Sequence, residues 1–213
     1  MPLAEVRRGI GAGFGNQASP AMGMTTLGHL VVTNFYQAAI LDGRGYQIRN
    51  GTISVPEVGD IVITDTDAEM CVDAASGTTV MPVAVNISFN LAAATLFESA
   101  GKSVGTASNA GTAQVPLPLK TDGSAAVSTA RVQSAGAVQV AAELATTTRR
   151  HFSWSQPIAA GAWPTWYDWQ PVYAPALVGV QCFYVQIGAD TTGPSYFANV
   201  DYLEFPTLLI NPS

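Results

Sequence analysis

Charged side chains are scarce in this sequence. Only 11% of its 213 residues are Asp, Glu, Lys or Arg, against about 25% in an ordinary soluble domain. Hydrophobic residues make up 48%, and the mean hydropathy is +0.23. Two interpretations fit this composition. Either much of the surface is covered by other copies or other chains, or the chain is a secreted β-protein with a neutral polar surface.

Basic residues are scarcer than acidic ones. Nine Lys and Arg stand against fifteen Asp and Glu, which gives a net charge of −6 and a pI near 4.7. A protein that binds nucleic acid through a basic surface needs clustered Lys and Arg to displace the counterions of the phosphates. The basic groups here are small, Arg7–Arg8 and Arg149–Arg150 with His151 beside it. The composition therefore argues against that class of protein.

Catalytic motifs are missing as well. The two histidines, His29 and His151, have no second histidine at metal-ligand spacing, and neither G-x-S-x-G nor H-E-x-x-H occurs. The run G-I-G-A-G-F-G lacks the preceding strand and the following Lys-Ser/Thr of a phosphate loop. Ser99–Lys102 fits S-x-x-K without its companion motifs. Because no nucleophile, base and orienting group can be assembled, we do not expect an enzyme.

Cysteine occurs only twice, too few for a disulfide framework. Cys182 lies in a very apolar segment, so we expect a small buried side chain there, and a bridge to Cys71 only in an oxidising compartment. No window reaches the roughly 18 apolar residues of a membrane helix. The first residues lack the apolar core of a signal peptide, which predicts synthesis in the cytosol.

Strand patterns are abundant. Residues 83–91 alternate between apolar and small polar side chains over nine positions, which is typical of a half-buried strand. Residues 177–188 are apolar on both faces and predict a fully buried strand, while residues 195–206 alternate again, so the two predict a central hairpin. Strand-like segments are also expected at 27–41, 46–55 and 60–72. Between 92 and 150 the pattern is ambiguous: a short helix is expected near 92–105 and a strand is weakly favoured at 134–150.

Three further segments carry candidate site residues. Residues 1–26 are too rich in glycine for a helix and predict an extended or disordered arm. Residues 151–176 hold all four tryptophans among several prolines, which predicts a long loop. This loop is a sugar-binding platform, a subunit contact, or a cover over its own core. Asp65, Asp67 and Glu69 would share one face of a strand, solvated or binding Ca²⁺ or a subunit.

The last segment carries a family resemblance. A strand, a Thr/Gly/Ser turn and a final strand ending D-Y-L-E-F-P span residues 177–206. This pattern resembles the last strand pair and E-x-P ending of noda-, sobemo- and tombus-like viral coat proteins, while residues 27–176 match them in strand rhythm only. The resemblance implies an all-β fold, an antiparallel eight-stranded jelly-roll sandwich with long loops. It also implies a flexible arm at 1–26 and a shell domain at 27–213.

The same resemblance implies a function. The chain would be a capsid protein of a virion, made in the host cytoplasm, whose many copies assemble into an icosahedral shell around the genome. Those families carry a strongly basic arm, whereas this one has only Arg7 and Arg8, which implies weak direct contact with the genome. We expect residues 1–26 to be ordered by contact with another chain, and Ca²⁺ is the one cofactor considered, at subunit interfaces. The expected interface residues are Phe14, Met22, Met24, Trp163, Trp166, Trp169 and Tyr173.

Two other functions remain open from the sequence. One is a carbohydrate-binding β-sandwich that uses the tryptophan-rich residues 154–173 as its platform and Asp65, Asp67 and Glu69 as a calcium site. The other is a subunit of a tail tube or fibre, which also has few charges and extended arms.

Overall fold

The computed structural model describes residues 23–24, 30–31, 35–91, 96–134, 136–143, 147–157, 166–189 and 193–210. The predicted arm lies outside these residues, apart from the backbone of Gly23–Met24 (β1), which pairs with Leu30–Val31 (β2). Two helices occur in this part of the chain, Phe35–Leu41 (α1) and Thr207–Ile210 (α2). Neither of them is long and apolar enough to cross a membrane.

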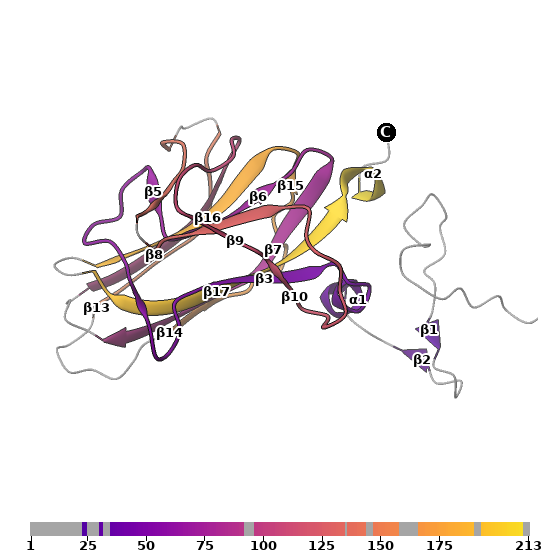
Figure 1. Ribbon diagram of the computed structural model, residues 1–213, viewed down its shortest axis with the longest axis horizontal. Coiled ribbons are helices and arrows are strands. Elements are labelled where there is room, and N and C mark those ends of the chain that lie inside the picture. Colours follow the sequence, from indigo (N-terminus) through magenta and orange to yellow (C-terminus); the bar gives the residue numbers. More distant parts are fainter. Residues whose placement is uncertain are drawn as a thin grey trace, which may run out of the picture.

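Two antiparallel sheets make up most of the structure (Figure 1). The first, called the β17 sheet here, has the order β10-β3-β17-β7-β14, with β15 also on β7 and β4 also on β17. Its strands are β3 (Gly45–Asn50), β4 (Glu57–Val58), β7 (Thr78–Leu91), β10 (Leu117–Pro118), β14 (Trp166–Trp169), β15 (Leu177–Val178) and β17 (Ser195–Pro206).

The second sheet, the β16 sheet, has the order β13-β8-β16-β6-β11-β9. Its strands are β6 (Met70–Ala74), β8 (Leu96–Val104), β9 (Thr112–Gln114), β11 (Thr129–Val132), β13 (Arg149–Pro157) and β16 (Gln181–Ala189). A separate short pair joins β5 (Asp67–Ala68) to β12 (Val138–Gln139). The expectation of an all-β protein with antiparallel sheets is confirmed.

The main core lies between the two sheets. Alternate residues of β7 and β17 meet alternate residues of β6 and β16, because successive side chains of a strand point to opposite faces. Phe89 of β7 stacks on Phe97 of β8 with ring centroids 4.2 Å apart. The largest side chains of this core that are completely buried are Tyr196, Tyr202, Phe89, Phe97, Phe183, Ile48, Met70, Ile87, Leu177 and Ile187.

The last two long strands do not form the predicted hairpin. β16 lies between β6 and β8, whereas β17 lies between β3 and β7 in the other sheet. The connection between them therefore crosses from one sheet to the other. The expected burial is confirmed: β16 is buried from Cys182 to Ala189, and β17 alternates between buried and half-buried residues over most of its length. Sheet membership depends on partners far away in the sequence, so the turn residues alone did not reveal it.

β7 confirms the strand expected at 83–91 and extends it back to Thr78. Pro82 lies inside this central strand, where a missing N–H would ordinarily break the ladder. The register with β17 shifts between Asp201 and Tyr202, opposite Ala84 and Pro82. This irregularity accommodates the proline.

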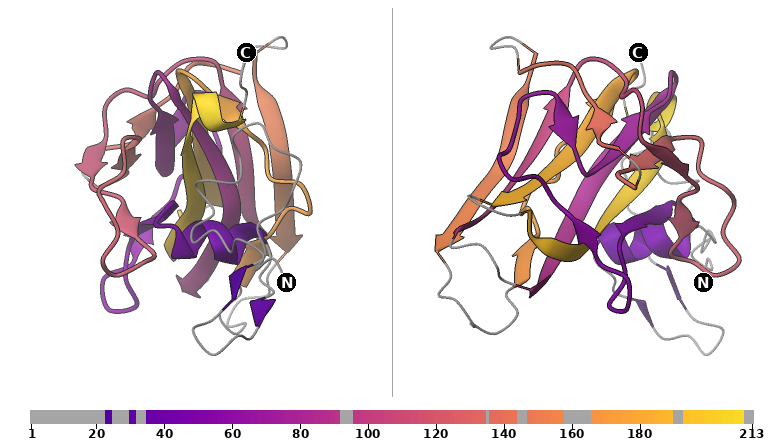
Figure 2. Two further views of the ribbon diagram at one scale, coloured as in Figure 1. Left: turned by 90° about the vertical axis from the view of Figure 1, so that its right-hand side faces the viewer. Right: turned by 60° about the vertical axis from the view of Figure 1, so that its left-hand side comes forward.

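Helix α1 replaces part of the strand expected at 27–41. Its apolar side chains recur at helical spacing and cover Leu203 and Phe205 on the outside of the β17 sheet, next to β3 (Figures 1 and 2). Gly43, with φ of 76°, ends the helix. Its N–H donates to Ile40, and that of Arg44 donates to Ala39, the two bonds of a glycine C-cap.

Other expectations between residues 92 and 157 were partly wrong. Residues 96–104 form strand β8, not a helix, because they are paired on both sides by β13 and β16. Of residues 134–150, only Val138–Gln139 and Arg149–Arg150 are in strands among those described. The tryptophan-rich region is not one loop: β13 contains its residues 151–157 and β14 contains residues 166–169, while residues 170–176 lie outside the strands. Both are outer strands of their sheets, where proline at the flanks is tolerated.

Candidate functional site

The outer face of the β16 sheet carries an unusual set of buried polar side chains. Met70, Val72 and Ala74 of β6 point into the core between the sheets. Cys71 and Asp73 must therefore point to the opposite face. The same alternation on β16 turns Phe183 inward and Cys182 outward. The outer face of a sheet is ordinarily exposed to solvent. Here the loop after β8 and the β12 segment cover Cys71, Asp73 and Cys182, which are 6% exposed or less.

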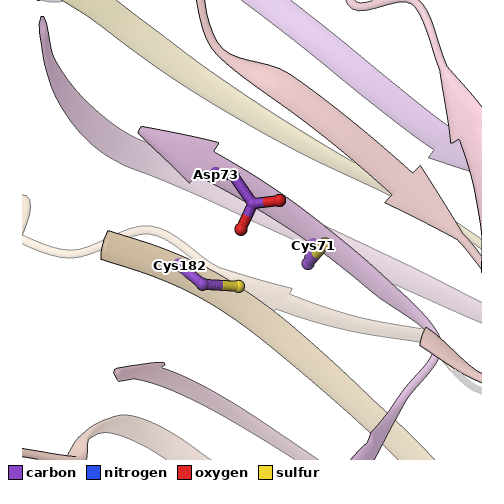
Figure 3. A group of neighbouring side chains, drawn as sticks. All are labelled: Cys71, Asp73 and Cys182. Carbon is purple, nitrogen blue, oxygen red and sulfur yellow. The ribbon is translucent and has the colours of Figure 1, made fainter. Parts of the chain in front are cut away.

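Register brings Cys71, Asp73 and Cys182 together, and we call them the cysteine–aspartate cluster (Figure 3). Cys182 is paired with Asp73, and Tyr184 with Cys71. One ligand atom from each of the three, two Sγ atoms and a carboxylate oxygen, lie within 4.8 Å of one another. Within the described part of the chain, no other set of three Cys, His, Asp or Glu side chains is grouped in this way.

Ser108 links the cluster to the covering loop. Its N–H donates to Asp73 Oδ1 at 2.8 Å, and its hydroxyl donates to Asp73 Oδ2 at 2.6 Å. The Cys71 thiol in turn donates to Ser108 Oγ at 3.1 Å. The carboxylate thus accepts hydrogen bonds but is not paired with a basic side chain among the described residues.

The electrostatics of the cluster favour a neutral Cys182 thiol. Burial raises the pKa of the Cys182 thiol well above its usual value, and the neighbouring Cys71 and Asp73 raise it further. Both cysteines are free and buried, in agreement with the expected burial of Cys182. The nearest basic residue by register is Arg131, opposite Cys71, whose Nη1 donates to the Ala110 carbonyl at 3.3 Å.

Next to the cluster, the same face holds an ion pair and a tyrosine. Lys102, paired with Tyr184 across the strands, is 5% exposed, and its Nζ lies 2.7 Å from Glu143 Oε2. The hydrogen bond from Lys102 lowers the pKa of Glu143, and Arg150 adds a contact at 3.1 Å. Burial, followed by the charge of Glu143, raises the pKa of Tyr184. The Tyr184 hydroxyl has no hydrogen-bond partner among the described residues.

The three acidic residues proposed from the sequence differ in their exposure and in their hydrogen-bond partners. Asp65 is exposed, Asp67 accepts a bond from Gln139 Nε2 at 2.5 Å, and Glu69 is 1% exposed. Glu69 Oε2 accepts the Ile187 N–H at 2.6 Å. Because the strand at this point covers only Asp67–Ala68, the expected alternation over all three fails. Calcium at these residues stays a prediction, with ligands also coming from a neighbouring chain.

Glu69 belongs to a second acidic group. Burial raises the pKa of Glu69 well above its usual value, and Asp60 raises it further, while the Ile187 N–H lowers it. Burial, followed by the charge of Asp67, raises the pKa of Asp60. Asn50 donates to the Glu69 carbonyl and to the Tyr196 hydroxyl. The hydrogen bond between Glu69 and the Ile187 N–H holds residues 59–69 against β16.

The predicted tryptophan platform is divided. Trp154 and Trp169 pack against the main core, Trp169 with its ring centroid 5.9 Å from that of Phe183. Trp166 and Tyr173 are 71% and 90% exposed. Trp163 lies outside the described residues, as do Phe14, Met22, Arg7 and Arg8, and only the backbone of Met24 is described.

Trp166 adjoins a row of polar side chains that the sequence did not reveal. On the outer face of the β17 sheet, five residues from four strands are joined by side-chain hydrogen bonds of 2.7 to 3.4 Å, and we call them the outer polar ladder. They are Gln47, Asp201, Asn199, Asn86 and Asp168. Burial raises the pKa of Asp201, while bonds from Gln47 and Asn199 lower it.

A comparison with models of protein families and with curated proteins finds no match to this chain. Function must therefore be argued from the fold and from these surfaces.

Proposed function

We propose that the chain is a viral coat protein whose copies assemble into an icosahedral shell. The observation that carries the proposal is the strand order. The eight main strands in chain order are β3, β6, β7, β8, β13, β14, β16 and β17. In the β17 sheet they lie in the order first, eighth, third, sixth, and in the β16 sheet in the order second, seventh, fourth, fifth. This order supports a jelly roll, an architecture of viral shells, lectin domains and cupins.

Exposed apolar side chains favour an assembling subunit over a carbohydrate-binding monomer. Five large apolar residues between positions 53 and 62 are more than half exposed, and Val172 and Tyr173 form a second group. A monomer rarely leaves so much apolar surface in water, and a coat subunit covers it against its neighbours. The five are Ile53, Val55, Val58, Ile61 and Val62.

The test is the assembly state of the purified chain, measured by sedimentation and negative-stain microscopy. We expect closed hollow particles. We expect Ile53→Asp to shift the population toward free subunits, because a charge buried in an interface without a partner is costly. Ile53→Val, which keeps the position apolar, is the matched control and should assemble. A monodisperse monomer at high concentration would refute the proposal, and filaments would favour a tube or fibre subunit.

A second candidate function rests on the outer polar ladder. Amide and carboxylate groups in a row beside the exposed Trp166 present hydrogen bonds and an aromatic face, as a carbohydrate site does. If the chain has this function, the unassembled wild-type chain should bind to glycans on an array, and Trp166→Ala should abolish that binding. Tyr173→Ala, which removes an exposed aromatic ring outside the ladder, leaves it unchanged. Absence of binding by the wild-type chain would exclude this function.

A further inference from the structure

The cysteine–aspartate cluster poses a chemical problem that the shell function does not explain. Asp73 is 6% exposed, and its carboxylate accepts two hydrogen bonds from Ser108 and lies against the Cys182 thiol, with no basic partner among the described residues. A buried charge is ordinarily paired with an opposite charge or coordinates a metal. Two thiols, the softest ligands a protein offers, lie against this carboxylate.

We propose that Cys71, Asp73 and Cys182 bind one Zn²⁺ ion between the β16 sheet and its covering loop. Zinc is of borderline softness and accepts thiolate and carboxylate together, whereas Ca²⁺ and Mg²⁺ prefer oxygen ligands alone. A zinc ion with these three anions retains a single negative charge, and Arg131 is the basic residue paired with Cys71 across the strands.

The geometry suits a tetrahedral ion. With Zn–S of about 2.3 Å and Zn–O of about 2.0 Å, the corners of the tetrahedron are about 3.3 to 3.8 Å apart. The three ligand atoms already lie within 4.8 Å of one another, so small rotations about χ1 bring them into place. Ser108 Oγ lies 3.1 Å from Cys71 Sγ and 2.6 Å from Asp73 Oδ2, so a further oxygen adjoins two of the three ligands.

A disulfide is the competing use of two neighbouring cysteines, and the register argues against it. Cys71 faces Tyr184 and Cys182 faces Asp73, so the cysteines are diagonal neighbours. Diagonal positions are about 7 to 8 Å apart, whereas the Cα atoms of a disulfide are usually about 4.4 to 6.8 Å apart. Closing the bond would require a shift of the β6–β16 backbone, and coordination through a central ion does not.

Binding replaces the two thiol protons with the ion: Zn²⁺ enters, both thiols become thiolates, and two protons leave. The affinity should therefore rise with pH, by up to about 100-fold per pH unit while both thiols remain protonated in the metal-free chain.

The test uses the full chain, stripped with a chelator under reducing conditions and then titrated with Zn²⁺ against a chromophoric competitor. We expect one equivalent per chain. Co²⁺ titrated alone should give the near-ultraviolet absorption of thiolate-to-cobalt charge transfer, which reports sulfur ligands directly in the wild-type chain. Failure of the wild-type chain to bind stoichiometric Zn²⁺, or a Co²⁺ spectrum without that absorption, overturns the proposal.

Variants locate the site. Asp73→Asn and Cys182→Ser should each weaken Zn²⁺ binding by roughly 100-fold or more, since even residues behind the ligands change affinity by 10- to 100-fold. Asp201→Asn, which alters a half-buried carboxylate on the other sheet, is the matched control and should bind as the wild type does. Equal affinity in all three variants overturns the proposal. So does the loss of both free thiols in the metal-free chain without reductant, because the cysteines would then serve as a disulfide.

Discussion

Gly101 of β8 lies opposite Phe152 of β13, whose ring occupies the space that a Cβ atom would fill. The ring packs inward because the register of β13 shifts between Arg150 and Phe152. His151, beside the shift, also reaches inward: its Nε2 lies 2.8 Å from Ser103 Oγ, and its ring is 5.8 Å from that of Phe183. A single irregularity thus places two consecutive rings on the core side of the sheet.

We predict that Gly101→Ala lowers the free energy of unfolding by about 1–3 kcal/mol, the usual cost of overpacking a core. The added methyl group would collide with the Phe152 ring. Gly105→Ala is the matched control on the adjoining loop, because nothing lies within 4 Å of its added Cβ. Denaturant unfolding of both variants measures the difference. Equal stabilities would mean that β13 moves away without cost.

A second residue-scale prediction concerns Glu69. Because burial and Asp60 raise its pKa, the folded chain holds this proton more tightly than the unfolded chain. Stability from this group is therefore greatest below the ordinary carboxyl range and falls as pH rises through that range toward the raised pKa. We predict that Glu69→Gln loses less stability than wild type as the pH rises above the ordinary carboxyl range.

The measurement is denaturant unfolding at a series of pH values. Glu98→Gln, the same change at a partly exposed residue of β8, is the control for the loss of a carboxylate. Parallel curves for wild type and Glu69→Gln would show that Glu69 titrates alike in the folded and unfolded chains.

At the scale of elements, loops are tied to strands by buried carboxylates. Glu204 of β17 is 7% exposed, and its two oxygens accept the N–H groups of Val127 and Ser128 at 2.9 and 2.8 Å. Ser128 Oγ also lies 2.8 Å from the Tyr202 hydroxyl. The loop before β11 is thereby fixed to the end of the β17 sheet.

We predict that Glu204→Ala costs about 1–3 kcal/mol, because the N–H of the buried Ser128 loses its partner. Hydrogen exchange should become faster at residues 127–128, with little change in β16. Asp122→Ala removes the acid of an exposed pair with Lys120 on the same loop and should change stability by less than about 1 kcal/mol. Unchanged exchange at Ser128 in Glu204→Ala would contradict the prediction.

Elements were predictable from the sequence where one face is consistently apolar. β7 and β17 alternate so regularly that their existence and burial followed from period two alone. Helix α1 was mistaken for a strand because Phe35, Tyr36 and Ile40 also favour strands, and only its packing on Leu203 and Phe205 decides. β8 was mistaken for a helix because its small residues carry little periodic signal.

The cysteine–aspartate cluster could be predicted from the sequence only in part. Positions 71 and 73 share a face of any strand, so one half of the cluster was open to inference. The other half comes from Cys182, more than a hundred residues away, whose register with β6 no local pattern encodes. The outer polar ladder depends in the same way on residues of β3, β7, β14 and β17 meeting side by side.

At the scale of the whole molecule, β17 lies between β3 and β7, and every other strand described precedes it in the chain. During synthesis, β3 and β7 therefore cannot be joined into one sheet until the strand that pairs with both of them has left the ribosome. In a chain truncated before Ser195, the edges of β3 and β7 that pair with β17 would lack their hydrogen-bond partners. The β17 sheet therefore cannot be completed before β17 has been synthesised, and until then its unpaired strand edges favour association between nascent chains.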